Sequence, residues 1–214
     1  MSQDRLPPPD PEACLVRLRP STQKGGTLIA EDVIDWVTHD RRICDPDGYR
    51  PAVCLTCGGS SLHIHDYRER VLRAEPTTPV TRIVRLACAT CGAIWQVLPS
   101  FIARHLWRTW PTVVHTLVPD AAPASTDPPR WPTVPSRTMR RWRARWERSA
   151  HALAQILAVS GAATWAALAG LLRPDARCHD LILAYADQSG SRFSLAVAAV
   201  AALIYRLQPK VRLM

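Results

Sequence analysis

The sequence has almost no lysine. Its only lysines are Lys24 and Lys210, so arginine carries nearly all the positive charge of a 214-residue chain whose formal net charge is +9. Arginine binds phosphate through two parallel hydrogen bonds and stacks on flat rings. This bias favours an acidic partner such as nucleic acid. GC-rich coding, which enriches Arg, Ala and Pro together, is an alternative explanation of the composition. It does not remove the net positive charge.

An apolar leader is also missing. Residues 1–12 read MSQDRLPPPDPE, which is polar and rich in proline, so no secretory signal is predicted. We therefore expect a cytoplasmic protein, in which thiols stay reduced. The uncharged apolar run at residues 156–172 would be a helix of about 25 Å, shorter than the ~30 Å hydrocarbon core of a bilayer. This length argues against a membrane partner and favours alanine-rich helices that pack on each other or on a second subunit.

The seven cysteines are an odd number, which excludes a fully paired set of disulfides within the chain. Four of them form two C-x2-C pairs, each followed by a glycine, in CLTCGG at residues 54–59 and CATCG at residues 88–92. Such a turn presents two thiolates together, and glycine suits the positive φ that it requires. Two turns separated by a β-hairpin place four sulfurs around one ion. The sequence predicts one structural Zn²⁺ per chain, held by Cys54, Cys57, Cys88 and Cys91.

Other readings of the cysteines stay open at this point. An iron–sulfur site has the same spacing, whereas a redox dithiol would be a single C-x-x-C rather than a doubled one. His63 or His65 could replace a cysteine ligand, although their alternation fits a strand that faces solvent or phosphate. The remaining cysteines, Cys14, Cys44 and Cys178, lack partners at ligand spacing.

Secondary structure can be predicted around this motif. Residues 62–73 and 80–88 are rich in β-branched and strand-forming residues and predict the two strands of a hairpin. Apolar spacing predicts short helices at residues 31–37, 100–110 and 112–118. Residues 119–135 contain six prolines and are predicted to be an irregular loop.

A basic helix is predicted after Ser136. Met139, Trp142 and Trp146 fall at i, i+3 and i+7 and form a stripe that packs in a core. Arginines cover the rest of its surface, a pattern that suits a DNA groove or backbone. The alternative is a helix with a solvated charged face. The candidate nucleic-acid contacts in the hairpin and in this helix are Arg68, Arg70, Arg73, Arg82, Arg85, Arg137, Arg140, Arg141, Arg143 and Arg145.

The stretch CLTCGGSSLHIHDYRERVLR…VTRIVRLACATCGAIWQVLPSF resembles the N-terminal zinc ribbon of bacterial insertion-sequence transposases and related stand-alone zinc-ribbon proteins of unknown function. PSRTMRRWRARW is similar to the second helix of the helix-turn-helix that often follows. The resemblance implies metal ligation by the four paired cysteines and DNA contact by the basic helix. The proline-rich residues 119–135 stand where the family has a short turn.

A transposase catalytic domain is not predicted, because it needs three separated carboxylates that hold two metal ions. Asp187, in LILAYADQSG, is the candidate with an apolar run before it, but only 27 residues follow it. We interpret it as a helix-terminal or turn residue, with a metal site completed by another chain as the weaker alternative.

Together these features predict an α+β protein with a four-cysteine zinc-ribbon hairpin, a helical region resembling a helix-turn-helix and alanine-rich C-terminal helices. We expect a non-enzymatic DNA-binding protein, related to transposases as an accessory or regulator. The alternative is a zinc-stabilised module that binds another protein. The expected regions are a lead-in with a short helix (1–49), the zinc ribbon (50–99), the basic helical region (100–150) and an apolar helical tail (151–214).

Overall fold

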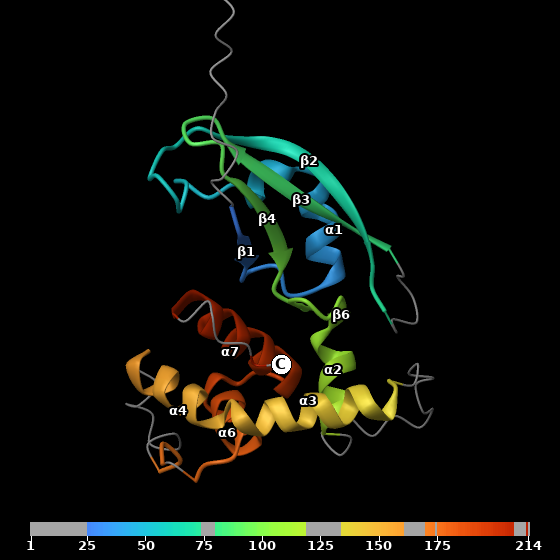
Figure 1. Ribbon diagram of the computed structural model, residues 1–214, viewed down its shortest axis with the longest axis vertical. Helices are drawn as coiled ribbons and strands as arrows, with labels where there is room; N and C mark the ends of the chain where they lie inside the picture. The colour runs from blue at the N-terminus through green and yellow to red at the C-terminus, as the bar shows by residue number, and fades with distance from the viewer. Residues whose placement is uncertain are drawn as a thin grey trace, which may run out of the picture.

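A computed structural model of the chain describes residues 25–73, 80–118, 134–160, 170–173, 175–207 and 213. Figure 1 shows a curved sheet backed by one helix, above a second layer made of helices. The predicted α+β class is confirmed.

The larger sheet has four strands in the order β1-β4-β3-β2. The strands β2 and β3 form the predicted antiparallel hairpin, and a β-bulge between Ile64 and Asp66 interrupts their register. β4 adds antiparallel to β3, and β1 then pairs parallel to β4, from Thr27 beside Gln96 onward. The bounds are β1 Thr27–Ala30, β2 Leu62–Val71, β3 Val80–Cys88 and β4 Ile94–Pro99. Residues 27–30, expected to be part of a lead-in, therefore belong to the sheet.

The first helix, α1, spans Trp36–Cys44 and is followed by a 3-10 turn, η2, at Pro46–Tyr49. The predicted helix at residues 31–37 is therefore wrong in position. Asp35 has an extended backbone, and its carboxylate accepts a hydrogen bond from the Thr38 N–H at 2.8 Å. This N-cap starts the helix at Trp36 because it satisfies one of the first free N–H groups.

Residues 100–110 do not form the predicted helix. Two short strands, β5 (Ile102–Ala103) and β6 (Arg108–Thr109), pair antiparallel there. His105 and Trp107, between them, have φ values of 70° and 51°, in the left-handed region that breaks a right-handed helix. The side chain of Thr109 then caps α2, so the helix begins only at Trp110.

The remaining described helices form the second layer. The predicted helix at residues 112–118 is confirmed as part of α2, Trp110–Leu117. The basic helix is α3, in which Ser136 is the first helical residue rather than the N-cap. The tail contains one helix, α6, that the apolar pattern did not predict. The bounds are α3 Ser136–Arg148, α4 Ala150–Val159, α6 Cys178–Ser189 and α7 Phe193–Leu207. The proline-rich loop lies almost wholly outside the described residues.

Each layer has its own buried core. One cluster joins the sheet to α1 and includes Val33, Ile83 and Leu86, and the other joins the helices around Leu153 and Leu181. Three contacts of α7 connect the layers. The Tyr205 hydroxyl donates to the Thr27 carbonyl at 2.7 Å, Arg206 pairs with Glu31 at 3.2 Å, and Arg104 lies over the Tyr205 ring at 3.9 Å.

Within the described residues, no single helix has the length and apolar character needed to cross a membrane. Taken together, α6 and α7 would meet that requirement by length and composition alone, but the chain bends by 105° between them.

Candidate metal centre and basic surface

The two C-x2-C-G segments fold into turns with the same backbone hydrogen bonds. The Gly58 N–H donates to the Cys54 carbonyl, and the Gly92 N–H donates to the Cys88 carbonyl, both at 2.8 Å. Both glycines have positive φ, 71° and 75°, as predicted. The N–H of the first cysteine in each turn then donates to a carbonyl five residues later, at 2.8 Å and 2.9 Å. The repeated sequence therefore encodes a repeated local structure.

The four cysteines of these turns form one cluster. Their sulfur atoms all lie within 4.8 Å of one another. Cys54 Sγ is 3.8 Å from Cys91 Sγ, and Cys57 Sγ is 3.7 Å from Cys88 Sγ. Zinc–sulfur bonds of about 2.3 Å in a tetrahedron place sulfurs about 3.8 Å apart. The cluster therefore has the ligand type, number and spacing to hold one metal ion, and it is consistent with zinc.

The electrostatics of the cluster favour a bound cation. Burial raises the pKa of the Cys54 thiol, but hydrogen bonds, first those from the backbone N–H groups of Thr56 and Cys57, outweigh burial and bring this pKa to about 6. The Cys91 N–H lowers the pKa of Cys88.

The pKa of Cys91 moves the other way. The Ala93 N–H lowers it, but burial and the neighbouring cysteine sulfurs together raise it to about 12. Neighbouring thiolates oppose further ionisation because like charges repel. A cation at the centre would remove that repulsion, and its binding would release protons.

Trp95 lies beside the cluster and fits the same chemistry. Its indole nitrogen is buried without a hydrogen-bond partner in the described part of the chain, yet it is near enough to Cys54 to help lower the pKa of that thiol. A metal-bound thiolate is a better acceptor for this N–H than a neutral thiol. The ring packs against Gly26, where a Cβ would come within 3.0 Å of it.

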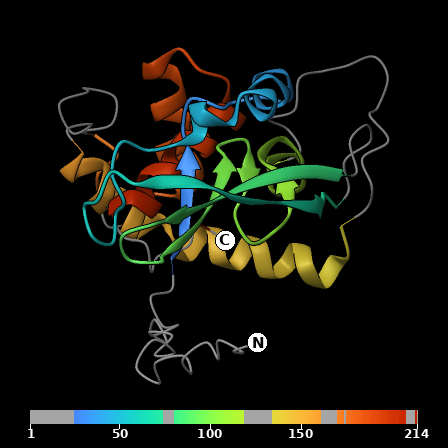
Figure 2. The same ribbon diagram turned by 90° about the horizontal axis from the view of Figure 1, so that it is seen from above.

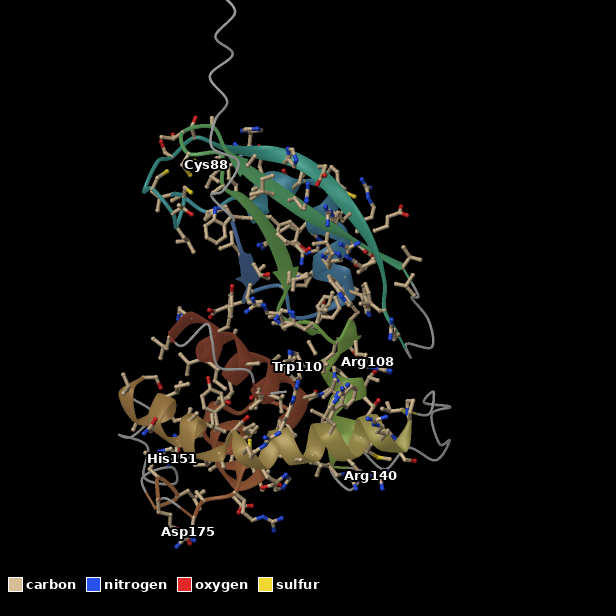
Figure 3. All side chains as sticks on the ribbon, viewed as in Figure 1. Cys88, Arg108, Trp110, Arg140, His151 and Asp175 are labelled. Atoms are coloured by element: carbon tan, nitrogen blue, oxygen red, sulfur yellow. The ribbon has the colours of Figure 1, made fainter. Side chains whose placement is uncertain are left out.

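The cluster closes one end of the hairpin and the basic side chains gather at the other. Leu62 pairs with Cys88 beside the sulfurs, whereas Arg70 pairs with Thr81 near the far end of the ladder. Eight residues of strand separate Leu62 from Arg70, or about 26 Å. In Figure 3, Cys88 lies at the top of the molecule, and Arg108 and Arg140 lie well below it, toward the other side.

The remaining histidine and cysteine candidates lie outside the cluster. His63 and His65 are exposed on β2, in agreement with the strand interpretation rather than the ligand swap. Cys44 is exposed and Cys178 is buried in the helical layer, where burial raises the pKa of its thiol. Cys14 lies outside the described residues.

The predicted arginines of the hairpin have different surroundings. Arg85 donates two hydrogen bonds to Asp66, at 2.6 Å and 2.8 Å, and its side chain is only 15% exposed. Arg82 is exposed and lies over the Tyr67 ring, 4.5 Å from its centre. Arg68 and Arg73 are exposed, whereas Arg70 is half-buried. The Arg70 guanidinium lies 5.2 Å from the ring centre of Trp107.

Helix α3 has the two faces that the sequence predicted. Trp142 and Trp146 are each 3% exposed and belong to the helical core, and Met139 is half-buried. The five predicted contact residues on this helix are all exposed: Arg137, Arg140, Arg141, Arg143 and Arg145. Asp187 is exposed on the last turn of α6, as a helix-terminal residue.

Arg108 links the two groups of arginines, and sequence reasoning missed it. Its guanidinium donates to the Arg73 carbonyl at 3.3 Å and lies 5.4 Å from the ring centre of Trp142 on α3. The Arg73 N–H donates to the Trp107 carbonyl at 2.7 Å. These contacts of Arg108 were not predicted, because residues 100–110 were expected to form a helix. No local sequence pattern indicates the positive φ of Trp107.

A family described as Domain of unknown function (DUF6431) matches residues 54–142. The matched region begins at the first cysteine of the cluster and ends at Trp142 within α3. Comparisons with curated proteins and with solved structures gave no match. The chain is therefore similar to a family whose pattern includes both the cysteine cluster and the first half of the basic helix.

Proposed function

We propose that the protein binds duplex DNA through a basic surface formed by the hairpin and α3, and that a structural zinc ion stabilises the hairpin. The observation that carries this proposal is the chain of contacts from Arg73 through Arg108 to Trp142, which places the arginine end of the hairpin next to α3. Two groups of arginines far apart in sequence then act on one partner.

The exposed side chains of this surface suit phosphate. Five arginines of α3 project away from a core-facing tryptophan stripe, and guanidinium groups bind phosphate oxygens bidentately. Phosphate neutralisation supplies most non-specific affinity for DNA and makes it salt-dependent. Arg85 is less suited than the other predicted contacts, because its ion pair with Asp66 already uses the guanidinium. Arg143 and Arg70 each donate one hydrogen bond to a backbone carbonyl, of Thr116 and of Glu69.

The metal has a structural role in this proposal. Four thiolates complete the tetrahedral coordination of zinc and leave no open position for water or substrate. We therefore infer a binding protein rather than an enzyme. The resemblance to the N-terminal region of transposases supports an accessory or regulatory role beside a separate transposase, with the C-terminal helices as a surface for another subunit.

The two helices that would correspond to a helix-turn-helix are not joined by a short turn in this chain. α2 ends at Leu117 and α3 begins at Ser136, so 18 residues separate the two helices instead of the usual short turn. We infer that α3 acts as a phosphate-binding helix supported by α2, rather than as a recognition helix held by a tight turn.

A salt titration tests the proposal. Binding to a fluorescent 20-base-pair duplex is measured by anisotropy between about 50 and 200 mM salt, for the wild-type protein and for the Arg140→Ala/Arg141→Ala variant. The variant should bind more weakly, and the slope of log K against log salt should fall by about 0.9 for each phosphate contact removed. Arg173→Ala is the matched control, because Arg173 is an exposed arginine outside this surface, paired with Asp175.

Negligible affinity of the zinc-loaded protein at 50 mM salt would contradict DNA binding. Equal weakening by the control and the α3 variant would contradict the assignment of binding to this surface. The first result would favour the protein-binding alternative, for which the exposed pair Val71 and Val80 at the end of the hairpin, 62% and 45% exposed, offers an apolar contact.

A further inference from the structure

The outer part of the hairpin extends beyond the rest of the sheet. β4 pairs with β3 only between Arg85 and Ala87, whereas β2 continues to pair with β3 as far as Val80. Residues 67–71 and 80–84 therefore form a two-stranded segment without a third strand, which we name the outer ribbon. Five residues of strand give it a length of about 17 Å.

The two faces of the outer ribbon differ in chemistry. On the inner face, Thr81 is 3% exposed and Ile83 is fully buried. His39 of α1 lies against this face, because its Nε2 atom is 3.0 Å from both Thr81 Oγ1 and the Arg82 carbonyl. Side chains alternate between faces along a strand, so the outer face carries a different set. Val84, opposite Tyr67, is 1% exposed, and the other members of that set are exposed and mixed in character: Tyr67, Glu69, Val71, Val80 and Arg82.

Arg82 is held in place on the outer face. It lies over the Tyr67 ring at 4.5 Å and stands directly opposite Glu69 in the ladder. A cation–π contact restricts the guanidinium without using its N–H groups. An arginine held in this way keeps its fork of donors for a partner and loses little conformational entropy on binding.

The outer face lies on the same side of the molecule as α3. Figure 2, the view from above, shows α1 on one side of β2 and β3 and α3 on the other. Because α1 lies against the inner face, the outer face and the basic helix are turned toward the same side. A single duplex can therefore meet both.

We propose that the outer ribbon enters the major groove of DNA and reads base edges through Arg82 and Glu69, while the arginines of α3 hold phosphates. This inference rests on the proposed function, DNA binding, and assigns its sequence preference to the outer ribbon. The major groove, about 12 Å wide, admits a two-stranded ribbon, and 17 Å of ribbon spans about five base pairs at 3.4 Å each.

The side chains of the outer face predict which bases are read. Arginine binds the O6 and N7 atoms of guanine bidentately, and glutamate accepts a hydrogen bond from the N4 amino group of cytosine. Apolar side chains such as Val71 and Val80 contact the methyl group of thymine. The preferred site therefore has a G or C at its centre, where Arg82 and Glu69 face each other, and T toward the end of the ribbon.

Selection from a randomised duplex library, followed by affinity measurements, tests this assignment. The zinc-loaded wild-type protein should select a site of about five base pairs that contains guanine. Arg82→Ala should lower the ratio of specific to random-sequence affinity by about 10-fold to 100-fold. Arg140→Ala should weaken binding to both duplexes equally. Tyr67→Phe, which keeps the ring, should retain the preference, and Tyr67→Ala should reduce it.

The outcomes separate the two proposals. If the wild-type protein binds DNA without sequence preference, or if Arg82→Ala weakens binding to both duplexes equally, the reading role of the ribbon is overturned while DNA binding stands. If no duplex binds at low salt, both proposals fail. Zinc content and circular dichroism of each variant establish that it is folded. Arg82→Lys adds a second check, because lysine lacks the arginine fork and should retain affinity for random DNA while losing preference.

Discussion

The sulfur atoms of Cys57 and Cys88 lie 3.7 Å apart although 31 positions separate the two residues in the chain. Only the return of the hairpin brings them together, because each residue belongs to a different turn. Cys57 is exposed and Cys88 is buried, so the cluster lies at the surface with one side open to solvent. The metal ion would therefore connect two turns that also meet through the first rungs of the ladder and through the close approach of Gly59 to Thr90.

Removing ligands from this cluster should remove the metal. We expect about one zinc per wild-type chain by elemental analysis, and none after Cys57→Ser/Cys88→Ser. Because metal binding to a structural site is coupled to folding, the double variant should also lose a large part of a typical stability of about 5–15 kcal/mol. Cys44→Ser, which changes an exposed cysteine at the end of α1, should retain the metal. Iron in the wild-type protein, with visible absorbance, would contradict the assignment to zinc.

We expect the glycines after the cysteine pairs to stabilise the fold only through the backbone conformation that they allow. A Cβ added at Gly58 or Gly92 would meet nothing within 4 Å, but both residues have positive φ. Gly92→Ala should therefore lower the free energy of unfolding by about 1–2 kcal/mol, measured by denaturant titration of the zinc-loaded protein. Gly170→Ala is the matched control, because its Cβ also meets nothing and its φ is not positive. Equal effects of the two changes would refute the left-handed turn.

The cysteine cluster was predictable because its signal is local. Cys54 and Cys88 each begin a short motif whose turn geometry follows from spacing and from the glycine after it. The parallel pairing of β1 with β4 was not predictable in this way, since four residues such as Thr27–Ala30 carry no periodic signal and pair across about 70 positions of sequence.

The region around Trp107 shows a different limit of sequence reasoning. Phe101, Ile102 and Leu106 have helical spacing, but the first two are buried in the sheet core, and the chain turns back at His105 and Trp107 with positive φ. Apolar spacing indicates which residues are buried, but it does not determine the backbone conformation between them. Tertiary packing determined the conformation of this segment and therefore the position of Arg108.

On helix α3, we expect the buried residues to determine stability and the exposed arginines to have little effect on it. Trp146 is 3% exposed in the helical core, so Trp146→Ala should lower the free energy of unfolding by about 3–5 kcal/mol, measured by thermal or denaturant unfolding. Arg145, one position earlier, is exposed, and Arg145→Ala should change stability by less than about 0.5 kcal/mol. If Arg145→Ala destabilises the fold as much as Trp146→Ala, the arginine face is part of the packing.

His39 should make stability depend on pH. It is 2% exposed, and burial is the main cause that lowers its pKa below the ordinary value of 6.5. Its Nε2 faces the Arg82 carbonyl, so this nitrogen carries the proton, and its Nδ1 accepts from the Tyr49 hydroxyl at 2.5 Å. The charged ring would keep the bond to the Arg82 carbonyl, but its Nδ1 could no longer accept from Tyr49. Protonation of Nδ1 would also place a charge in the buried space between α1 and the sheet.

The direction of the pH effect follows from this lowered pKa. The folded protein binds the proton more weakly than the unfolded chain, so the stabilisation is complete above pH 6.5 and is lost as the pH falls below it, through the folded-state pKa. The loss cannot exceed about 1.4 kcal/mol per pH unit for one group. Urea unfolding of the zinc-loaded protein at pH 7.5, 6.5 and 5.5 measures it. His39→Gln should be less stable at pH 7.5 by about 1–3 kcal/mol and should show a smaller fall with acid. His63→Gln, which changes an exposed histidine on β2, should keep the wild-type profile. A wild-type slope in His39→Gln would assign the acid sensitivity to other groups, the cysteine thiolates first among them.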